Sequence, residues 1–341
     1  MNADDVARCA RVSPSTVSRV LNNAASVRSA TRARVVKAME ALRYGPNLHA
    51  RSLATGKSRS IGIIVSNIEN PFFLDIYRAV ERGIRGAGYE LILASTDYSS
   101  ESLVSNVRLM LGSQVAGLAA IVSEMDAALI EELSGSRVPV VFYDLGAPRR
   151  NIFNIRVNCR RGMETLISCL YSLGHRRVGF VGHRATLGPV SERSRAALDA
   201  VRHDSDFQVA TVAGADSLEG GRCAARALLG ANPDVTAIVC VNDWMAVGAL
   251  RELREGGLRV PGDISVTGFD DISMAQFSFP PLTSVHIPRD RIGQIICDRL
   301  MNLRAVQFQR EFVIDPELVI RDSTGPAATR GGAILKSSRR V

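Results

Sequence analysis

The 341-residue sequence contains few aromatic residues and no long apolar run. Phe, Trp and Tyr together make up 5% of the chain, whereas Gly, Ala, Val, Ile and Leu are plentiful. This composition favours a helix-rich α/β protein over an all-β sandwich. No stretch approaches the roughly 18 consecutive apolar residues of a membrane span, and the first residues are acidic. We therefore expect no transmembrane helix and no secretory signal, and a cytoplasmic protein.

Residues suited to catalysis or metal binding are also sparse. The six cysteines include no close pair at the spacing of a metal site, so we expect small buried thiols in a reducing compartment. Only three lysines and five histidines are present, and they are scattered. We find no GxSxG, GxGxxG, HExxH or P-loop motif, which argues against a hydrolase or an oxidoreductase. No enzymatic activity, cofactor or metal is expected.

Positive charge is concentrated at the N-terminus. Residues 1–60 hold eleven Lys and Arg against three acids, a net charge of +8. This equals the net charge of the whole chain, so residues 61–341 sum to zero. A small basic segment joined to a neutral body is typical of a DNA-binding domain attached to one that does not contact phosphates. The alternative is a solvated basic face without a partner.

Three short helices are predicted in this basic segment, over 4–10, from Pro14 to Asn22, and over about 30–43. Asn2 or Asp4 is expected to cap the first helix, Ser13 the second and Ser29 the third. The second helix buries an apolar stripe and leaves short hydroxyls, an amide and an arginine on its other faces. Such a helix fits a DNA major groove, so the segment is predicted to be a helix-turn-helix.

A linker follows over residues 46–59, punctuated by Gly and Pro. Within it, residues 47–54 have helical propensity over barely two turns, too few for a stable isolated helix in water. We expect this short helix to fold only when it is docked. The alternative is an ordinary flexible tether.

From residue 60 to 322, short apolar runs alternate with helical stretches, which predicts two Rossmann-like lobes built from parallel sheets. The predicted strands are 61–65, 91–94, 118–122, 138–142, 178–181, 208–213, 237–241 and 264–269. The predicted helices are 72–87, 101–113, 126–134, 161–173, 190–203, 218–230 and 244–256. Residues 323–341 carry a net charge of +4 and no apolar heptad, so we expect a disordered basic tail without a coiled coil.

Polar side chains follow several of these strands, where ligands bind in doubly wound sheets. These residues are Ser66, Asn67, Ser123, Tyr143, Asp144, Asn242, Asp243, Asp270 and Asp271. Hydroxyls, amides and carboxylates that face one another across a cleft suit a polyhydroxylated ligand such as a sugar. A transport-type sugar receptor would have such a cleft too, but the basic segment and the absence of an export signal argue against it.

The N-terminal segment resembles the headpiece of the lactose and galactose repressor family. The resemblance lies in Asp5-Val6-Ala7, Val12-Ser13, residues 16–22 and Thr31-Arg32. It implies a DNA-binding set of Ser13, Pro14, Ser15, Thr16, Ser18, Arg19 and Asn22, together with Asn47, Ala50 and Leu53 of the short linker helix, which is the hinge helix in that family. In this set Ser15 and Arg19 meet base edges, and Leu53 wedges between base pairs from the minor groove. Arg11 stands where the family usually has glycine, so we expect a non-glycine residue at positive φ.

The resemblance continues to about residue 322, through Asn70-Pro71-Phe72-Phe73, Asn242-Asp243 and Gly268-Phe269-Asp270-Asp271 among other motifs. It implies an effector-binding set of Asn67, Phe72, Phe73, Arg193, Asn242 and Asp270, with Arg195 as the alternative to Arg193. Three positions depart from the family pattern. They are Asp216, where an aromatic residue is common, Asn158-Cys159 and Arg289. The loss of a stacking face argues against a flat purine, and Arg289 would suit an acidic sugar or a phosphate-bearing metabolite.

These observations predict a sequence-specific transcriptional regulator, most simply a repressor. It would bind a near-palindromic double-stranded operator as a homodimer, and a small metabolite between the lobes would control its affinity for DNA. The sequence leaves open the operator, the effector, and whether effector binding releases or recruits DNA.

Overall fold

The computed structural model divides the chain into two compact units, Met1–Ser58 and Arg59–Val341. It describes residues 2–21, 24, 26–44, 58–124, 127–144, 149, 151–183, 188–199, 206–301 and 310–328. Of the predicted DNA-binding set, Asn22, Asn47, Ala50 and Leu53 lie outside these residues. Each unit is described by itself below.

The first unit is a three-helix domain of α1 (Ala3–Ala10), α2 (Pro14–Leu21) and α3 (Ser29–Ala41). Its core holds Val6, Val17 and Val35, which are fully buried. Asn2 caps α1, because its side chain accepts hydrogen bonds from the backbone N–H groups of the first turn. The predicted cap at Ser29 is wrong, since Ser29 is already helical and the residue before it makes no side-chain cap.

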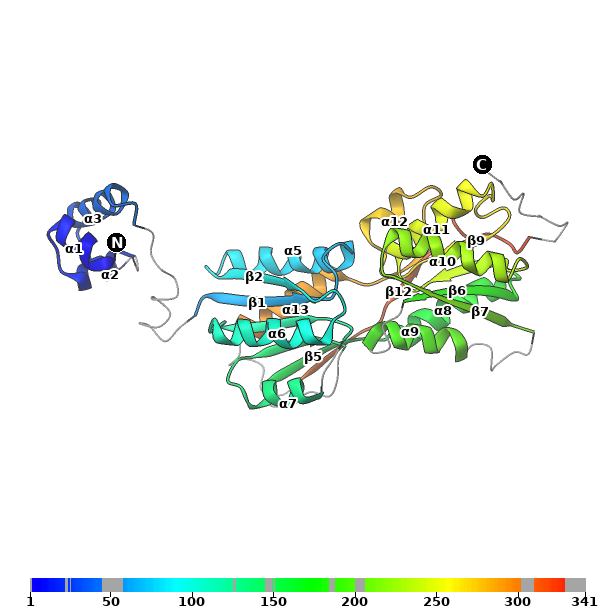
Figure 1. Cartoon of the computed structure of the whole chain (residues 1–341), viewed down its shortest axis with the longest axis horizontal. Coiled ribbons are helices and arrows are strands. Elements are labelled where there is room, and N and C mark those ends of the chain that lie inside the picture. The colour runs from blue at the N-terminus through cyan, green and yellow to red at the C-terminus, as the bar shows by residue number, and fades with distance from the viewer. Residues whose placement is uncertain are drawn as a thin grey trace. The chain divides into compact units, whose positions relative to one another are not determined.

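The first lobe of the second unit is a six-stranded sheet in the order β11-β5-β4-β3-β1-β2, parallel throughout (Figure 1). Its strands are β1 (Ser60–Val65), β2 (Glu90–Ser95), β3 (Gly117–Ile121), β4 (Val140–Tyr143), β5 (Ile152–Val157) and β11 (Glu311–Ile314). Its helices are α5 (Pro71–Arg85), α6 (Ser100–Gly112), α7 (Ala127–Gly135) and α13 (Arg289–Met301). Ile61 and Ile63 of β1 join the core cluster that includes α5 and α13, whereas Ile64 joins the cluster beneath α6 and α7. The sheet is therefore buried on both faces.

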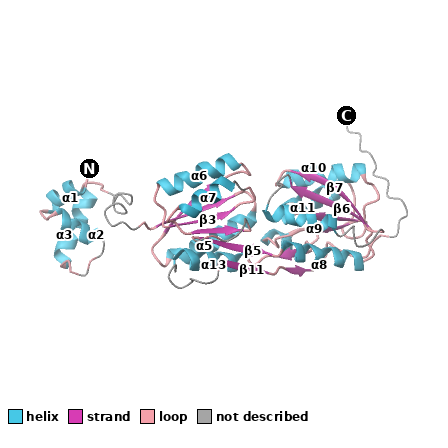
Figure 2. Cartoon of the chain, turned by 90° about the horizontal axis from the view of Figure 1, so that it is seen from below, coloured by secondary structure: helices cyan, strands magenta, loops and turns pink. Residues whose placement is uncertain are grey.

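The second lobe is a four-stranded parallel sheet in the order β7-β6-β8-β9 (Figure 2). Its strands are β6 (Arg177–His183), β7 (Gln208–Gly214), β8 (Ala237–Cys240) and β9 (Ser265–Thr267). Its helices are α8 (Cys159–Ser172), α9 (Gly188–Asp199), α10 (Leu218–Ala231), α11 (Asp243–Glu255) and α12 (Ser273–Phe277). A small antiparallel pair, β10 (Ser284–His286) and β12 (Glu317–Val319), completes it. The two predicted Rossmann-like lobes are confirmed.

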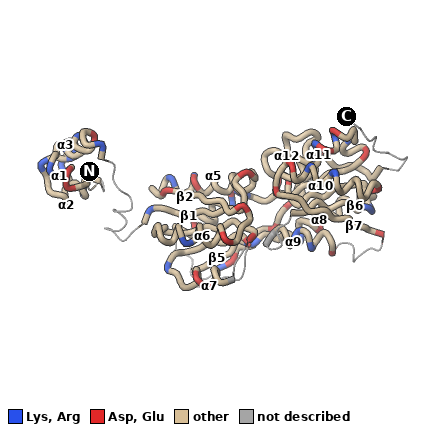
Figure 3. The backbone as a smooth tube through the Cα atoms, viewed as in Figure 1, with Lys and Arg blue, Asp and Glu red and all other residues tan. Residues whose placement is uncertain are grey.

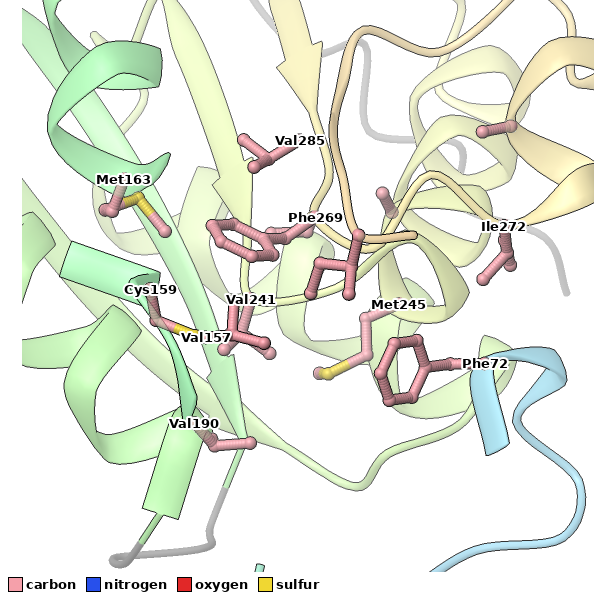
Figure 4. Packing of buried hydrophobic residues seen from close by; sticks show 14 of the residues in the cluster. Phe72, Val157, Cys159, Met163, Val190, Val241, Met245, Phe269, Ile272 and Val285 are labelled. Carbon is pink, nitrogen blue, oxygen red and sulfur yellow. The ribbon is translucent and has the colours of Figure 1, made fainter. Parts of the chain in front are cut away.

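The C-terminal part of the chain passes between the lobes more often than the sequence predicted. After β10 it returns to the first lobe as α13 and β11, and it then re-enters the second lobe as β12. One apolar cluster continues across both lobes. Figure 4 shows Phe72 of α5 beside Met245 of α11, with Phe269 near Val241. The hydrophobic core therefore continues from one lobe into the other.

The ordered part of the second lobe extends beyond residue 322. Ser323, the first residue of the expected disordered tail, is fully buried, and its hydroxyl donates to the carbonyl of Val266 at 2.6 Å. The backbone N–H of Ala327 donates to the carbonyl of Leu173. Residues 323–328 are thus tied to the lobe by hydrogen bonds. Within the described ranges, no helix has the length and apolar character needed to cross a membrane.

Candidate nucleic-acid interface and ligand cleft

Helix α2 buries an apolar stripe and exposes a polar face. Val17 and Val20 are buried in the three-helix core, whereas Ser13, Pro14, Ser15, Ser18 and Arg19 are exposed and Thr16 is half-buried. Most of the described residues predicted to bind DNA therefore lie at or near one solvent-facing surface. Figure 3 marks the basic positions of this unit in blue.

The exposed hydroxyls at the start of α2 are bonded to one another. The Ser13 hydroxyl lies 2.8 Å from the Ser15 hydroxyl and 2.9 Å from that of Thr16. It also accepts a hydrogen bond from the backbone N–H of Thr16, as expected for an N-cap. This arrangement gathers three hydroxyls at a helix N-terminus, where phosphate oxygens are favoured.

The turn that sets the angle between α1 and α2 contains the expected strained residue. Arg11 has φ 53° and ψ 52°, the left-handed conformation, so the prediction of a non-glycine residue at positive φ is confirmed. The other side of α2 is anchored by Arg32 of α3, whose guanidinium donates to the carbonyls of Val20 and Ala24. The orientation of α2 is therefore fixed by the turn that precedes it and by the Arg32 hydrogen bonds at its C-terminal end.

The cleft between the two lobes of the second unit contains a small cavity that is partly open to solvent. Five of the six residues of the predicted effector-binding set line it, and they come from α5, α9, the N-cap of α11 and the loop between β9 and α12. The lining residues are Asn70, Phe72, Phe73, Tyr98, Val122, Ser123, Tyr143, Val190, Arg193, Asn242 and Asp270. The strand-end rule selected four of the lining residues, Ser123, Tyr143, Asn242 and Asp270, whereas Phe72, Phe73 and Arg193 were expected from the family resemblance.

Tyr98 and Val190 line the cavity but were not predicted from the sequence. Tyr98 follows β2, and the same strand-end rule applied to that strand would have selected it. Val190 lies on α9, and its apolar character carries no signal that separates it from core residues. Its place in the cavity depends on tertiary packing alone.

A buried ion pair crosses the base of the cavity. Nη2 of Arg193 lies 2.8 Å from Oδ1 of Asp270, and both side chains are about 5% exposed or less. Arg193 also donates to the carbonyl of Val241 and lies 4.0 Å over the ring of Phe269. Burial raises the pKa of Asp270 to about 6, although Arg193 acts in the opposite direction. The Nε atom of Arg193 is buried, and no hydrogen-bond partner for it is found among the described residues. Arg195, the alternative, is exposed and bonded to Ser191.

Asn67 does not line the cavity; its amide instead donates to Asp216, in the loop between β7 and α10. The carboxylate of Asp216 is 6% exposed and also accepts hydrogen bonds from Asn70, Tyr98 and Asn242. Asp216 and Asn242 belong to the second lobe, and the other donors belong to the first. One carboxylate thus connects the two sides of the cleft.

The structure does not place Arg289 at the cavity, so it gives no support to the expectation of an acidic ligand that rested on this residue. The guanidinium of Arg289 is directed to Oδ2 of Asp75, at 3.2 Å, and to the backbone carbonyls of Asp270, Asp271 and Ile287. Its side chain is 13% exposed, and it is not among the residues that line the cavity. Arg289 therefore fastens α13 and α5 of the first lobe to a loop of the second.

Among the described residues, one group has the spacing of a metal site. Ligand atoms of Asp144, Cys159 and Glu192 lie within 4.8 Å of one another. Burial raises the pKa of the Asp144 carboxyl to about 7 and that of the Cys159 thiol to about 12. The positively charged Arg193 guanidinium lies beside the Cys159 thiol and would repel a metal cation at this place. We therefore assign no metal to this group. Asn158, beside it, caps α8.

Comparison with known proteins identifies a family in which both kinds of domain occur in one chain. The family model for bacterial regulatory proteins of the lacI family matches residues 3–47, and the model for a periplasmic binding protein-like domain matches residues 167–324. The HTH-type transcriptional repressor PurR of Photobacterium profundum is 33% identical over 333 residues, which cover 94% of this chain and 97% of the relative. The chain belongs to the lacI family.

Other lacI-family members agree along the whole length. The ribose operon repressor of Haemophilus influenzae is 30% identical, with 94% of this chain and 97% of the relative covered. The solved structure of the Lac repressor dimer bound to operator and the anti-inducer ONPF has a TM-score of 0.79 and 28% identity, covering 95% of this chain and 99% of that one. A lacI-family regulator from Silicibacter pomeroyi has a TM-score of 0.84 and 25% identity at the same coverage. This protein is a DNA-binding transcriptional regulator with an effector-binding domain.

Proposed function

We propose that this lacI-family regulator is a homodimeric repressor in the cytoplasm whose affinity for a near-palindromic operator is controlled by a small metabolite in the interlobe cleft. The observation that carries the DNA-binding part is the exposed polar face of α2 over its buried Val17 and Val20. A helix of this kind, with short side chains near an arginine, enters a major groove without steric hindrance.

On this face, Arg19 and Ser15 contact base edges, and Pro14 makes an apolar contact beside them. The hydroxyl cluster of Ser13 and Thr16 binds phosphate, because it lies at the N-terminus of α2. Ser18 and Asn22 complete the contacts. In the linker, Asn47, Ala50 and Leu53 contact the minor groove, with Leu53 inserted between base pairs.

In the cleft, Arg193 and Asp270 contact the effector through the polar atoms of their ion pair, and Phe72 and Phe73 cover its apolar face. The Nε of Arg193 supports this role, because it is a buried donor without a partner in the described part of the chain, and such a donor is costly unless a ligand satisfies it. The relatives support the assembly. One solved relative is described as a repressor dimer bound to operator, and another, CelR, as a cellobiose complex with a TM-score of 0.67 and 27% identity.

The proposal is tested by selecting the DNA sites that the protein binds from random duplex DNA. The affinity of each variant for the selected operator is then measured by titration. Arg19→Ala should weaken specific binding by about 5- to 150-fold, the loss of one good base contact, and should reduce discrimination at one base pair. Leu53→Ala should weaken operator binding and leave effector affinity nearly unchanged. Arg195→Ala, which removes an exposed arginine from the other unit, is the control.

Failure of the wild-type protein to bind any duplex at low ionic strength would refute the proposal. Equal operator affinity for Arg19→Ala and the wild type would refute the assigned role of α2. A panel of metabolites added to the selected complex then identifies the effector and shows whether it releases or recruits DNA.

A further inference from the structure

The polar wall of the interlobe cleft offers hydrogen-bond donors with fixed orientations. The side-chain oxygens of Asn67, Asn70 and Asn242 each accept a hydrogen bond from a nearby backbone N–H, those of Glu69, Phe72 and Met245. Each amide nitrogen must therefore point away from its own loop, and all three point at the carboxylate of Asp216. The backbone thus makes this part of the cleft a set of donors.

Two helix N-termini strengthen the same arrangement. Asn70 is the N-cap of α5 in the first lobe and Asn242 is the N-cap of α11 in the second. Helices of 15 and 13 residues therefore begin beside Asp216 from opposite sides of the cleft. The positive ends of their dipoles favour a negative charge at this point.

Tyr98 supplies a fourth donor. Its hydroxyl lies 2.5 Å from Oδ2 of Asp216, and burial, followed by the charge of Asp216, raises the pKa of this phenol well above its usual value. Tyr98 therefore stays protonated and donates. No ion pair joins Asp216 to Lys, Arg or His among the described residues, and Arg193 is engaged by Asp270. The carboxylate is held by neutral donors from both lobes.

We propose that Asp216 is an internal ligand that holds the cleft closed and determines its specificity. The donors of Asn67, Asn70, Tyr98 and Asn242 form a receptor for an anion, and the chain's own carboxylate fills it. A phosphate or a second carboxylate would meet this charge in a site of low dielectric, so anionic metabolites are excluded and the effector is neutral or cationic. This inference deepens the proposed function, because it concerns the ligand of the same cleft.

Chemical rescue tests the inference without knowledge of the effector. Asp216→Ala empties the receptor, and acetate added at millimolar concentrations should enter it. The variant should lose about 5 °C in Tm, as expected when a few buried hydrogen bonds are broken in a protein of this size. Sodium acetate at about 100 mM should restore at least half of this loss, by binding to the folded state alone. Sodium chloride at the same ionic strength should not.

The chain provides a local reporter and a matched control. Its single tryptophan, Trp244, lies two residues after Asn242, so its emission should shift in Asp216→Ala and return with acetate. Asp263→Ala removes another hydrogen-bonded carboxylate, one bound to Arg259 at the surface. Acetate should leave that variant unchanged, because the donors of Arg259 are open to solvent.

Two results would overturn the inference. One is an Asp216→Ala protein on which acetate acts no differently from chloride. The other is saturable stabilisation of the wild type by glucuronate or glucose 6-phosphate, which carry the excluded charge. Operator binding is measured separately, on the wild type. If the protein proves not to be a repressor, the acetate experiment can still be interpreted. If acetate does not rescue Asp216→Ala, the proposed repressor function is unaffected.

Discussion

The contact between α10 and α11 depends on two glycines that face the partner helix. A Cβ added at Gly221 of α10 would lie 2.0 Å from the carbonyl oxygen of Met245 in α11. A Cβ at Gly248 of α11 would lie 1.9 Å from the carbonyl oxygen of Leu218 in α10. Both obstacles are backbone atoms, so no side-chain rotation can relieve them. Gly221→Ala should therefore push the two helices apart by about 1 Å.

The expected cost follows from two opposing effects. Overpacking of this kind costs about 1–3 kcal/mol, and more when backbone has to move. Alanine recovers about 0.5–1 kcal/mol of helix propensity, so the net loss should be about 2 kcal/mol. Gly230→Ala is the matched control, since Gly230 lies in the same helix and a Cβ there meets nothing within 4 Å. It should stabilise the protein by about 0.5–1 kcal/mol.

The effect should reach the cleft as well. Helix α10 begins two residues after Asp216 and α11 begins directly after Asn242, whose side chains are 2.7 Å apart. Separation of the helices lengthens this hydrogen bond. Urea unfolding of the two variants measures stability, and Trp244 emission reports on the cleft. A Gly221→Ala protein as stable as the wild type, or a Gly230→Ala protein equally destabilised, would refute the reasoning.

Three further predictions concern other parts of the chain. Arg11→Gly should stabilise the helical unit by up to about 1 kcal/mol, because glycine adopts φ 53° without strain. The added stability would be seen as slower backbone hydrogen exchange in α1 and α2 of the full chain. Burial raises the pKa of Asp144 to about 7, so ionisation of this carboxyl lowers the stability of the wild type as the pH rises from about 4 to 7. In urea titrations, Asp144→Asn should therefore be more stable than the wild type by up to about 4 kcal/mol at pH 8 and equally stable at pH 4. A difference in stability that does not change with pH would contradict this. Ser323→Ala should lower the free energy of unfolding by about 1–3 kcal/mol, because it leaves the Thr283 N–H and the Val266 carbonyl without their buried partner. A variant with the same Tm as the wild type would show that this contact is dispensable.

The sequence by itself determined the features that depend on neighbouring residues. Helices α1 and α2 follow from their caps, Pro14 and apolar spacing, and the positive φ of Arg11 follows from a turn at which the resembling family usually has glycine. The strands follow from short apolar runs, and Asn242 and Asp270 follow from their positions at strand ends. In each case the deciding interactions lie within one helix, turn or strand, so the linear pattern contains them.

Only the tertiary structure decided what distant residues do together. The return of the chain to the first lobe as α13 and β11 depends on which sheet has a free edge and an uncovered face, which no local pattern records. Arg289 looked like a ligand-binding arginine until its partners, Asp75 and the carbonyls of Asp270 and Asp271, were in place. In the sequence, Asp216 was notable only because the resembling family usually has an aromatic residue at this position. Its role comes from amide donors 26 to 149 residues away in the chain, and only folding brings them to one carboxylate.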